Sequence, residues 1–202
     1  MQTEQRKNRI SPDELLDLGD YERKRDGIRN RAMAARLLRR VAIGPNATLS
    51  FEGRETVLYQ IQEILRAERI AKPAEVEFEA DNYSDLLPSE NELSATLMFE
   101  FPDEADRAVR LRDLAGFENH FFLEIDGAGR AVAFFDRRQI DPDRLSAVQF
   151  VRFPVTDVQR DAIARGARVA VVSDHPLYPF TSAIGAETRR ALAADLAEAA
   201  DV

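Results

Sequence analysis

A short apolar strand followed at once by a long amphipathic helix is the feature that most constrains this chain. It lies at residues 48–70, with the sequence TLSFEGRETVLYQIQEILRAERI. At about 100° per residue, the apolar side chains of the helix fill an arc of about 120°, which is wide enough for a core-facing stripe. These side chains are Val57, Leu58, Ile61, Ile64 and Leu65. The segment therefore predicts a strand, a turn and a helix at 54–71 that packs against a core.

The chain before this segment is predicted to be mainly helical. Residues 1–10 are polar, which is typical of a disordered tail. Ser11-Pro12-Asp13-Glu14 is a capping box with proline at the first helical position, and it predicts a short helix to Leu18. Asp20 is expected to cap a longer, Arg-rich helix that ends near Arg40.

A hairpin and a further helix flank the amphipathic helix. Residues 41–43 and 48–51 surround Gly44-Pro45-Asn46-Ala47, which indicates a hairpin with a short turn. Residues 73–87 fit either a strand, because apolar residues alternate with glutamates, or a helix. We favour the helix because Pro73 suits a first turn.

From residue 88 onward the sequence predicts a sheet with helices. Strands are expected at 93–101, 121–125, 131–135, 147–153 and 169–172, and helices at 103–116, 156–166 and 184–200. The predicted class is α+β: N-terminal helices and a short hairpin, then a mostly antiparallel sheet of about five strands covered by helices. We expect a helical part at 11–87 and a sheet part at 88–202, or a single domain at 11–202 if residues 41–51 join the main sheet.

Composition limits the chemistry and the compartment. The 202 residues include no cysteine, which excludes disulfides, cysteine-ligated metal sites and a thiol nucleophile. No apolar run approaches the ~18 residues of a membrane span, and the N-terminus has no secretory h-region, so a cytoplasmic location is expected. Residues 1–40 carry 11 Lys and Arg against 7 Asp and Glu, whereas residues 41–202 carry 17 against 29. The acidic body argues against broad nucleic-acid binding.

Glu68 and Arg54 fall on the apolar arc of the amphipathic helix. A carboxylate on a buried face must be paired, hydrogen-bonded or protonated, so Glu68 is the best sequence candidate for a perturbed acid. The alternative is that the helix has nearly ended by Glu68, so that its side chain reaches water or pairs with an arginine.

The opposite face of the helix carries a polar strip that includes Tyr59, Glu63 and Arg66 at spacings that allow contact. The strip could be a recognition surface or part of a carboxylate metal site, and the alternative is a solvated face or a helix–helix seam in a dimer. A di-iron bundle would need Glu-x-x-His motifs, and no glutamate here is followed by histidine three residues later.

Only two histidines are present, His120 and His175. The Asp174-His175 pair is expected in a loop after a buried strand, where it could serve as a base or a ligand; Asp-His-Pro could equally be a simple turn. His120, His175 and Glu68 are the candidate metal ligands, although no spacing demands a metal. No dinucleotide, P-loop or nucleophile-elbow motif is present, and no cofactor can be assigned.

Several segments together resemble an uncharacterised bacterial family, domain of unknown function 3501. They are GPNATLSFEGRETVLYQIQEILRAERI (44–70), SPDELLDLGDYERKR (11–25), ELSATLMFEFPDEADR (92–107), SAVQFVRF (146–153) and SDHPLY (173–178). The resemblance implies an association with rubrerythrin-like and iron–sulfur redox proteins, and it carries no catalytic residues. Without cysteine, a redox role would need a bound metal, a borrowed cofactor or a partner protein.

Two functional hypotheses follow. The first is a cytoplasmic accessory or interaction protein for a redox or iron-containing partner, with Tyr59, Glu63, Arg66 and the basic first helix as contact surfaces and a homo-oligomer as one arrangement. The second is a small-molecule or metal-dependent enzyme built from Arg54, Glu68, Asp174 and His175. It requires these four side chains to meet in one cleft.

Overall fold

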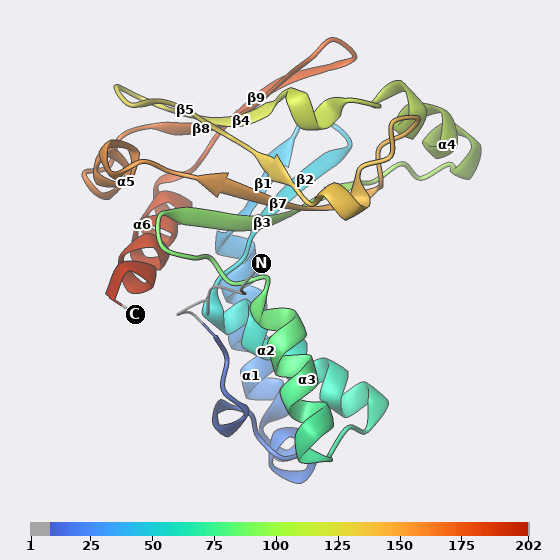
Figure 1. Cartoon of the computed structure of the whole chain (residues 1–202), viewed down its shortest axis with the longest axis vertical. Coiled ribbons are helices and arrows are strands. Elements are labelled where there is room, and N and C mark those ends of the chain that lie inside the picture. The colour runs from blue at the N-terminus through green and yellow to red at the C-terminus, as the bar shows by residue number, and fades with distance from the viewer. Residues whose placement is uncertain (1–8, 202) are drawn as a thin grey trace, which may run out of the picture.

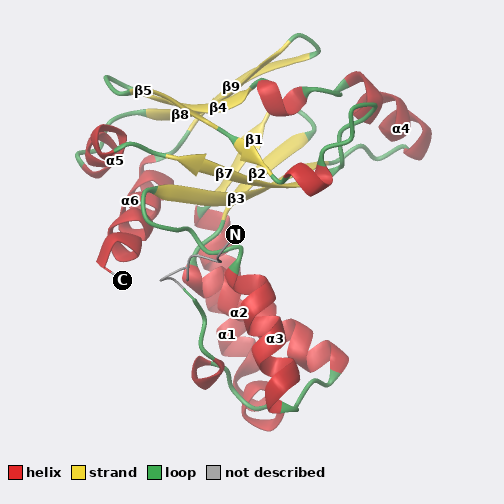
Figure 2. Cartoon of the chain, viewed as in Figure 1, coloured by secondary structure: helices red, strands yellow, loops and turns green. Residues whose placement is uncertain are grey.

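The computed structural model describes residues 9–201 and places a group of helices below two stacked β-sheets (Figures 1 and 2). The helices are η1 (Pro12–Glu14), α1 (Leu18–Leu38), α2 (Arg54–Glu68), α3 (Pro73–Ser84), α4 (Glu104–Asp113), η2 (Phe117–Asn119), η3 (Arg137–Gln139), α5 (Asp157–Ala164) and α6 (Ala186–Asp201). The strands are β1 (Arg40–Ile43), β2 (Ala47–Phe51), β3 (Glu92–Phe99), β4 (Phe121–Ile125), β5 (Gly129–Val132), β6 (Phe134–Phe135), β7 (Val148–Pro154), β8 (Val169–His175) and β9 (Tyr178–Ala183). The predicted α+β class is confirmed.

Within the described residues the strands form two antiparallel sheets where the sequence predicted one. The first, sheet A, has the order β1-β2-β3-β7-β6, and the second, sheet B, has the order β5-β4-β8-β9. The predicted hairpin of β1 and β2 joins sheet A, because β2 pairs with β3 and places Leu49 opposite Leu97. The split into two sheets arises near Ala133, where the chain leaves β5 in sheet B and continues as β6 beside β7 in sheet A.

Strand β9 was missing from the sequence prediction. We expected the strand at 169–172 to end in a loop, but β8 continues to His175, which pairs with Tyr178 across a two-residue turn. Proline was the misleading signal: Pro176 lies in the turn, and Pro179 lies in β9 at the edge of sheet B. An edge strand tolerates proline because one side of its backbone makes no ladder bonds.

An aromatic cluster centred on Phe117 fills the space between the two sheets. The Phe117 side chain in η2 is fully buried. Its ring centre lies 5.2 Å from that of Phe99 in sheet A and 5.3 Å from that of Phe121 in sheet B. Tyr178 also lies edge-on to Phe99, with the ring centres 5.5 Å apart. The cluster therefore packs one sheet on the other.

A smaller apolar cluster holds the helical part together. It contains Ile10, Leu87 and the predicted stripe of α2 at Val57, Ile61 and Leu65, all of them buried. The core face of α2 is thus confirmed. The alternating residues 73–84 form helix α3, as we favoured, and α3 packs on α2.

Several helix boundaries differ from the prediction. The segment expected as a helix from Pro12 to Leu18 is one 3₁₀ turn, which ends because Leu15 adopts an extended conformation; α1 begins at Leu18. The N-cap of α1 is Asp17, whose Oδ1 accepts the Asp20 N–H at 2.8 Å. The prediction that Asp20 caps this helix was therefore wrong. Helix α2 stops at Glu68 because Arg69 adopts a left-handed conformation with φ 55°.

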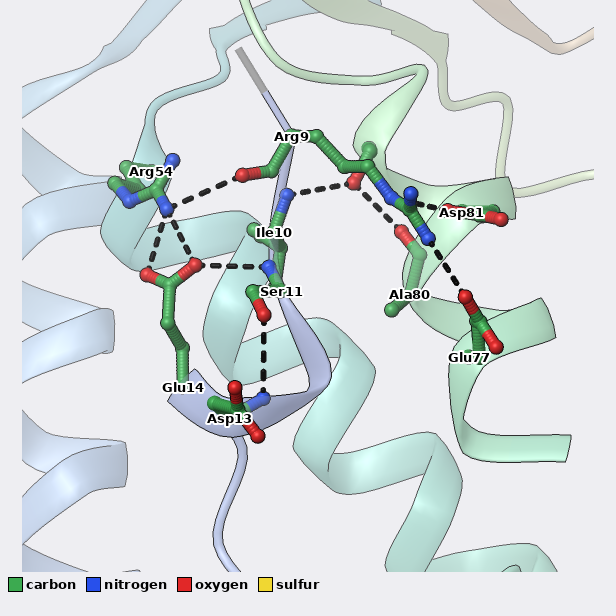
Figure 3. Close-up of polar contacts among 10 residues, drawn as sticks. Arg9, Ile10, Ser11, Asp13, Glu14, Arg54, Glu77, Ala80 and Asp81 are labelled. Atoms are coloured by element: carbon green, nitrogen blue, oxygen red, sulfur yellow. Dashed lines mark hydrogen bonds and ion pairs between the residues drawn. The ribbon is translucent and has the colours of Figure 1, made fainter. Parts of the chain in front are cut away.

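The disordered tail predicted for residues 1–10 lies outside the described residues, except for Arg9 and Ile10. For those two the prediction was wrong. Ile10 is fully buried, and its N–H donates to Ser84 Oγ at 2.9 Å. Arg9 forms ion pairs with Glu77 and Asp81 on α3 (Figure 3). The apolar side chain of Ile10 and these ion pairs hold the segment against the helices.

Helix α6 connects the sheets with the end of α1. Its Leu192 and Leu196 are buried in the main hydrophobic core. On its other side, Thr188 Oγ1 donates to the Leu38 carbonyl oxygen at 2.6 Å, and Asp195 accepts from Arg39 at 2.8 Å. Among the described residues, no helix combines the length and the apolar character needed to cross a bilayer.

Candidate functional site

The polar strip of α2 lies largely against α1 of the same chain. Glu63 Oε1 accepts from the Tyr21 hydroxyl at 2.6 Å, and its two oxygens accept from Arg25 Nε and Nη2 at 2.8 Å each. These bonds, above all those from Arg25, lower the pKa of Glu63 to about 2. Tyr59 is buried, and Arg66 Nε lies 3.6 Å from Glu63 Oε1. The strip is therefore a seam inside the chain.

Arg54 fastens the N-terminal segment to α2 (Figure 3). Its Nη2 lies 2.6 Å from both carboxylate oxygens of Glu14 and donates to the Arg9 carbonyl oxygen at 3.3 Å. Burial raises the pKa of Glu14, but hydrogen bonds from Arg54 and from the Ser11 N–H outweigh it, and the pKa lies below its usual value. Glu68 is exposed at the last turn of α2. The structure therefore agrees with the alternative reading, in which the helix has nearly ended by Glu68 and its side chain reaches water, and not with a buried acid.

The two histidines and Asp174 do come together. His120 precedes β4 and Asp174 lies in the neighbouring strand β8, so His120 Nδ1 is 2.9 Å from Asp174 Oδ1. The rings of His120 and His175 meet edge-to-face, with centres 5.3 Å apart. His175 lies at the end of β8 rather than in the expected loop. The rival enzyme hypothesis needed these groups beside Arg54 and Glu68, but β8 lies above sheet A and α2 below it (Figure 1).

His175 is buried, and its Nδ1 accepts the Leu177 N–H at 3.3 Å. Burial lowers the pKa of His175, although a backbone hydrogen bond with Ala115 opposes the shift. Among residues 9–201, no group of three or more His, Asp or Glu side chains is arranged to hold a metal ion.

The depressed pKa of His175 predicts a loss of stability in mild acid. Its folded-state pKa lies below the ordinary value of 6.5, so below that pH the unfolded chain binds the extra proton and the folded state is disfavoured. In urea denaturation at pH 7.5 and 5.5, the wild type should lose more stability on acidification than His175→Asn, whose amide oxygen can still accept from Leu177. An equal loss in the two proteins would contradict this prediction.

The outer face of sheet A is turned toward the helices (Figure 1). Two adjoining cavities of about 510 and 680 Å³ lie on this face and share Phe150, and together we call them the groove. The first lies between sheet A and the helices α1 and α2, with Met33 and Leu37 on its α1 side. The second lies between sheet A and the chain that follows α3, with Phe134 on its far side.

The floor of the groove is unusually apolar for an open sheet face. In β7, Val151 and Phe153 point into the core, so the alternate residues Val148 and Phe150 point outward, and both are exposed. Val148 pairs with Met98 across β3 and β7. Phe134 on β6 is 55% exposed, and Leu37 at the end of α1 is 75% exposed. The sheet thus presents apolar side chains on both faces.

Three acids of the groove, Glu52, Glu92 and Asp136, already accept hydrogen bonds or form ion pairs. Glu52 is buried and accepts from Thr96 Oγ1 at 2.8 Å and from Thr56 Oγ1 at 3.1 Å. Glu92 forms an ion pair with Arg152. Asp136 accepts from Arg138, and these bonds hold its pKa below the usual range. The carboxylates therefore have little capacity left for a ligand.

Two arginines at the ends of the groove have no such partner. Arg36 and Arg137 are exposed, and neither forms an ion pair with a carboxylate of residues 9–201. Arg36 lies with its guanidinium carbon 6.0 Å from the Tyr59 ring centre. Arg36 and Arg137 therefore give the groove positive charge that no carboxylate of residues 9–201 neutralises in an ion pair.

Sequence reasoning did not find this groove. The sequence did contain a signal. Met98 is apolar at an outward-facing position of its strand, and so are Val148 and Phe150 in theirs, whereas a half-buried strand usually has polar residues at such positions. Recognising the groove also required knowing which helices stand opposite the sheet.

Comparisons with known proteins agree with the sequence resemblance. The family described as Protein of unknown function (DUF3501) matches residues 9–196. A crystal structure of a protein of unknown function from Burkholderia pseudomallei K96243 is 33% identical, covering 93% of this chain and 98% of that one, with a TM-score of 0.86. Among curated proteins, none matches significantly.

Proposed function

Since this chain belongs to the family described as Protein of unknown function (DUF3501), we propose its function from its own geometry: it is an accessory protein that binds a protein partner in the groove of sheet A. The observation that carries the proposal is the row of exposed apolar side chains on the groove floor. Phe134, Val148 and Phe150 are all more than a third exposed, and they line two adjoining cavities that share Phe150. Contiguous exposed apolar surface of this kind is characteristic of interaction sites.

The partner segment we propose is apolar in its centre and acidic at its flanks. Aromatic and aliphatic side chains would cover Phe134 and Phe150, since fully burying one such side chain contributes about 1.5–3 kcal/mol. Asp or Glu on both sides would meet Arg36 and Arg137, which have no carboxylate partner within residues 9–201. Such charges at a rim steer association and fix the register of a bound segment more than they add affinity.

The class of partner to test first follows from the family resemblance. The resemblance implies an association with rubrerythrin-like and iron–sulfur proteins of bacterial redox or peroxide defence, so we propose a redox protein of the cytoplasm as the bound partner. In this proposal the chain needs no redox group of its own. It would position or stabilise the partner, and the partner would carry the metal.

A second candidate is acid–base chemistry at His120, because its contact with Asp174 at 2.9 Å is the one pairing of sequence candidates that would orient an imidazole. Asp174 would hold the ring through Nδ1 and leave Nε2 to exchange a proton. Both side chains are exposed, so a substrate there would remain in water, whereas catalytic sites usually exclude it. The groove therefore supports the first proposal better.

Site-specific photocrosslinking tests the proposed groove. The crosslinking residue p-benzoylphenylalanine replaces Val148 on the groove floor, and in a matched control it replaces Val158, an exposed residue of α5 outside the groove. In the bacterium that encodes the chain, the Val148 position should give a discrete adduct with a segment containing Asp or Glu beside apolar residues. Combining it with Phe134→Ala and Arg137→Glu should reduce that adduct at least tenfold, as expected when an apolar contact and a rim charge together contribute about 1.4 kcal/mol or more.

Two results would contradict the proposal. One is the same set of adducts from Val148 and Val158, which would mean random collision. The other is an adduct that Phe134→Ala and Arg137→Glu leave undiminished. Because Phe134 and Arg137 are exposed, neither substitution should affect folding, and circular dichroism of the purified variants checks this.

A further inference from the structure

A separate cavity of about 570 Å³ lies where α1, α2 and α6 meet. Residues from three distant parts of the sequence line it, and none of them belongs to the groove of sheet A. Part of its wall is apolar, formed by Leu16, Ile28, Leu58 and the buried Tyr59. A cavity of this size suits a small organic molecule.

Charged groups surround the apolar wall, with carboxylates in excess. Four acids, Glu14, Glu55, Asp195 and Glu198, stand against three arginines, Arg31, Arg39 and Arg54. Glu14 is held by Arg54, and Glu55 lies 3.9 Å from Arg31. Glu198 is exposed and forms no ion pair with any of the described residues. The net charge of the lining side chains is therefore negative, and the unpaired carboxylate lies on α6.

Asp195 gives a second, independent indication. Its side chain is only 8% exposed, and Oδ1 forms an ion pair with Arg39 Nη2 at 2.8 Å. The other oxygen, Oδ2, is buried and has no hydrogen-bond partner among residues 9–201. A buried acceptor without a partner is unfavourable, so a group that donates to Asp195 would be favoured.

Arg39 does not supply this missing bond. Its Nε also lacks a partner, but it is packed against the backbone of Gly53, where a Cβ would lie only 2.9 Å from it. Burial raises the pKa of Asp195, Arg39 opposes that shift, and Glu198 adds to it. The local need is thus for positive charge beside Asp195 and Glu198.

We propose that this cavity binds a small organic cation, an ammonium group carried on a hydrocarbon body. The ammonium would donate to Glu198 and, once a turn of the Asp195 side chain brings Oδ2 to the cavity, to Asp195 as well. The two residues lie one helical turn apart on α6. The hydrocarbon would lie on Leu58 and Tyr59. An ammonium carries three donors, which suits two carboxylates better than a neutral ligand would.

Titration calorimetry of the full chain with n-hexylamine tests this site. Hexanoate and 1-hexanol have the same hydrocarbon body without the positive charge and serve as matched probes. We expect one saturable site for hexylamine and at least tenfold weaker binding of the other two. Glu198→Gln should weaken hexylamine at least fivefold and Asp195→Asn at least tenfold, whereas Glu187→Gln, an exposed residue of α6 outside the cavity, should bind like the wild type.

The proposal is overturned if hexylamine does not bind, if the three probes bind equally, or if Glu198→Gln binds hexylamine as well as the wild type. Asp195 is buried, and its substitution could disturb folding. Glu198 is exposed, so the binding measured for Glu198→Gln does not depend on a change in folding. The crosslinking result in the sheet A groove does not depend on this cavity.

Discussion

Replacing Phe117 with alanine is expected to lower the free energy of unfolding by about 3–5 kcal/mol, the usual cost of removing a buried aromatic side chain. The Phe117 ring has no exposed surface, and it contacts Phe99 of sheet A and Phe121 of sheet B. Its loss would leave a cavity between the sheets that the rigid strands cannot close. Urea denaturation of the purified variant at neutral pH measures the change.

The matched control for Phe117 is Phe134→Ala. Phe134 is the same residue type but is 55% exposed on the outer face of sheet A, so its removal should change the stability by no more than about 0.5 kcal/mol. The pair therefore separates a core role from a surface role. Similar losses for the two variants would contradict the packing described here.

Substituting Glu63 with glutamine is expected to destabilise the chain by about 2 kcal/mol at neutral pH. The pKa of Glu63 falls from the ordinary 4.5 to about 2 through the bonds from Arg25 and Tyr21. A shift of this size corresponds to about 3 kcal/mol by proton linkage, and we reduce it because the side chain is 23% exposed and partly screened. Glutamine keeps the size of the side chain and removes its charge.

The stability difference between wild type and Glu63→Gln should also depend on pH. Because the folded-state pKa is depressed, the stabilisation is complete above pH 4.5 and is lost as the pH falls toward 2. Urea denaturation at pH 7, 4 and 3 should therefore show the difference between wild type and Glu63→Gln shrinking in acid. Glu55→Gln, which removes an exposed carboxylate 3.9 Å from Arg31, should be nearly neutral throughout. A difference that does not depend on pH would contradict the assigned role of the Arg25 contact.

The core face of α2 could be predicted because its signal is local. Apolar residues such as Val57, Ile61 and Leu65 repeat at helical spacing. Such a face is expected to be buried whichever element packs against it. The partners of Glu63 could not be predicted in the same way. Tyr21 and Arg25 lie 42 and 38 residues earlier in the chain, and only the packing of α1 on α2 brings them together.

Glu68 shows how a boundary of a few residues changes an inferred site. Helical spacing placed it on the buried arc only if the helix continued to residue 71. The left-handed backbone conformation of Arg69 ends the helix at Glu68. The Glu68 side chain therefore reaches the surface. The His120–Asp174 contact was missed for a different reason: the two residues become neighbours through the pairing of β4 with β8, and the sequence does not specify which strands pair.

The bonds between the end of α1 and helix α6 also bear on the order in which this chain folds. Thr188 and Asp195 are 150 and 156 residues away from the groups they bind at Leu38 and Arg39. Bringing such distant segments together costs loop-closure entropy that only the intervening structure can offset. The sheets must therefore be largely assembled before α6 docks on α1. On a ribosome, the end of α1 emerges 150 residues before Thr188 and waits for its contacts until α6 has been synthesised.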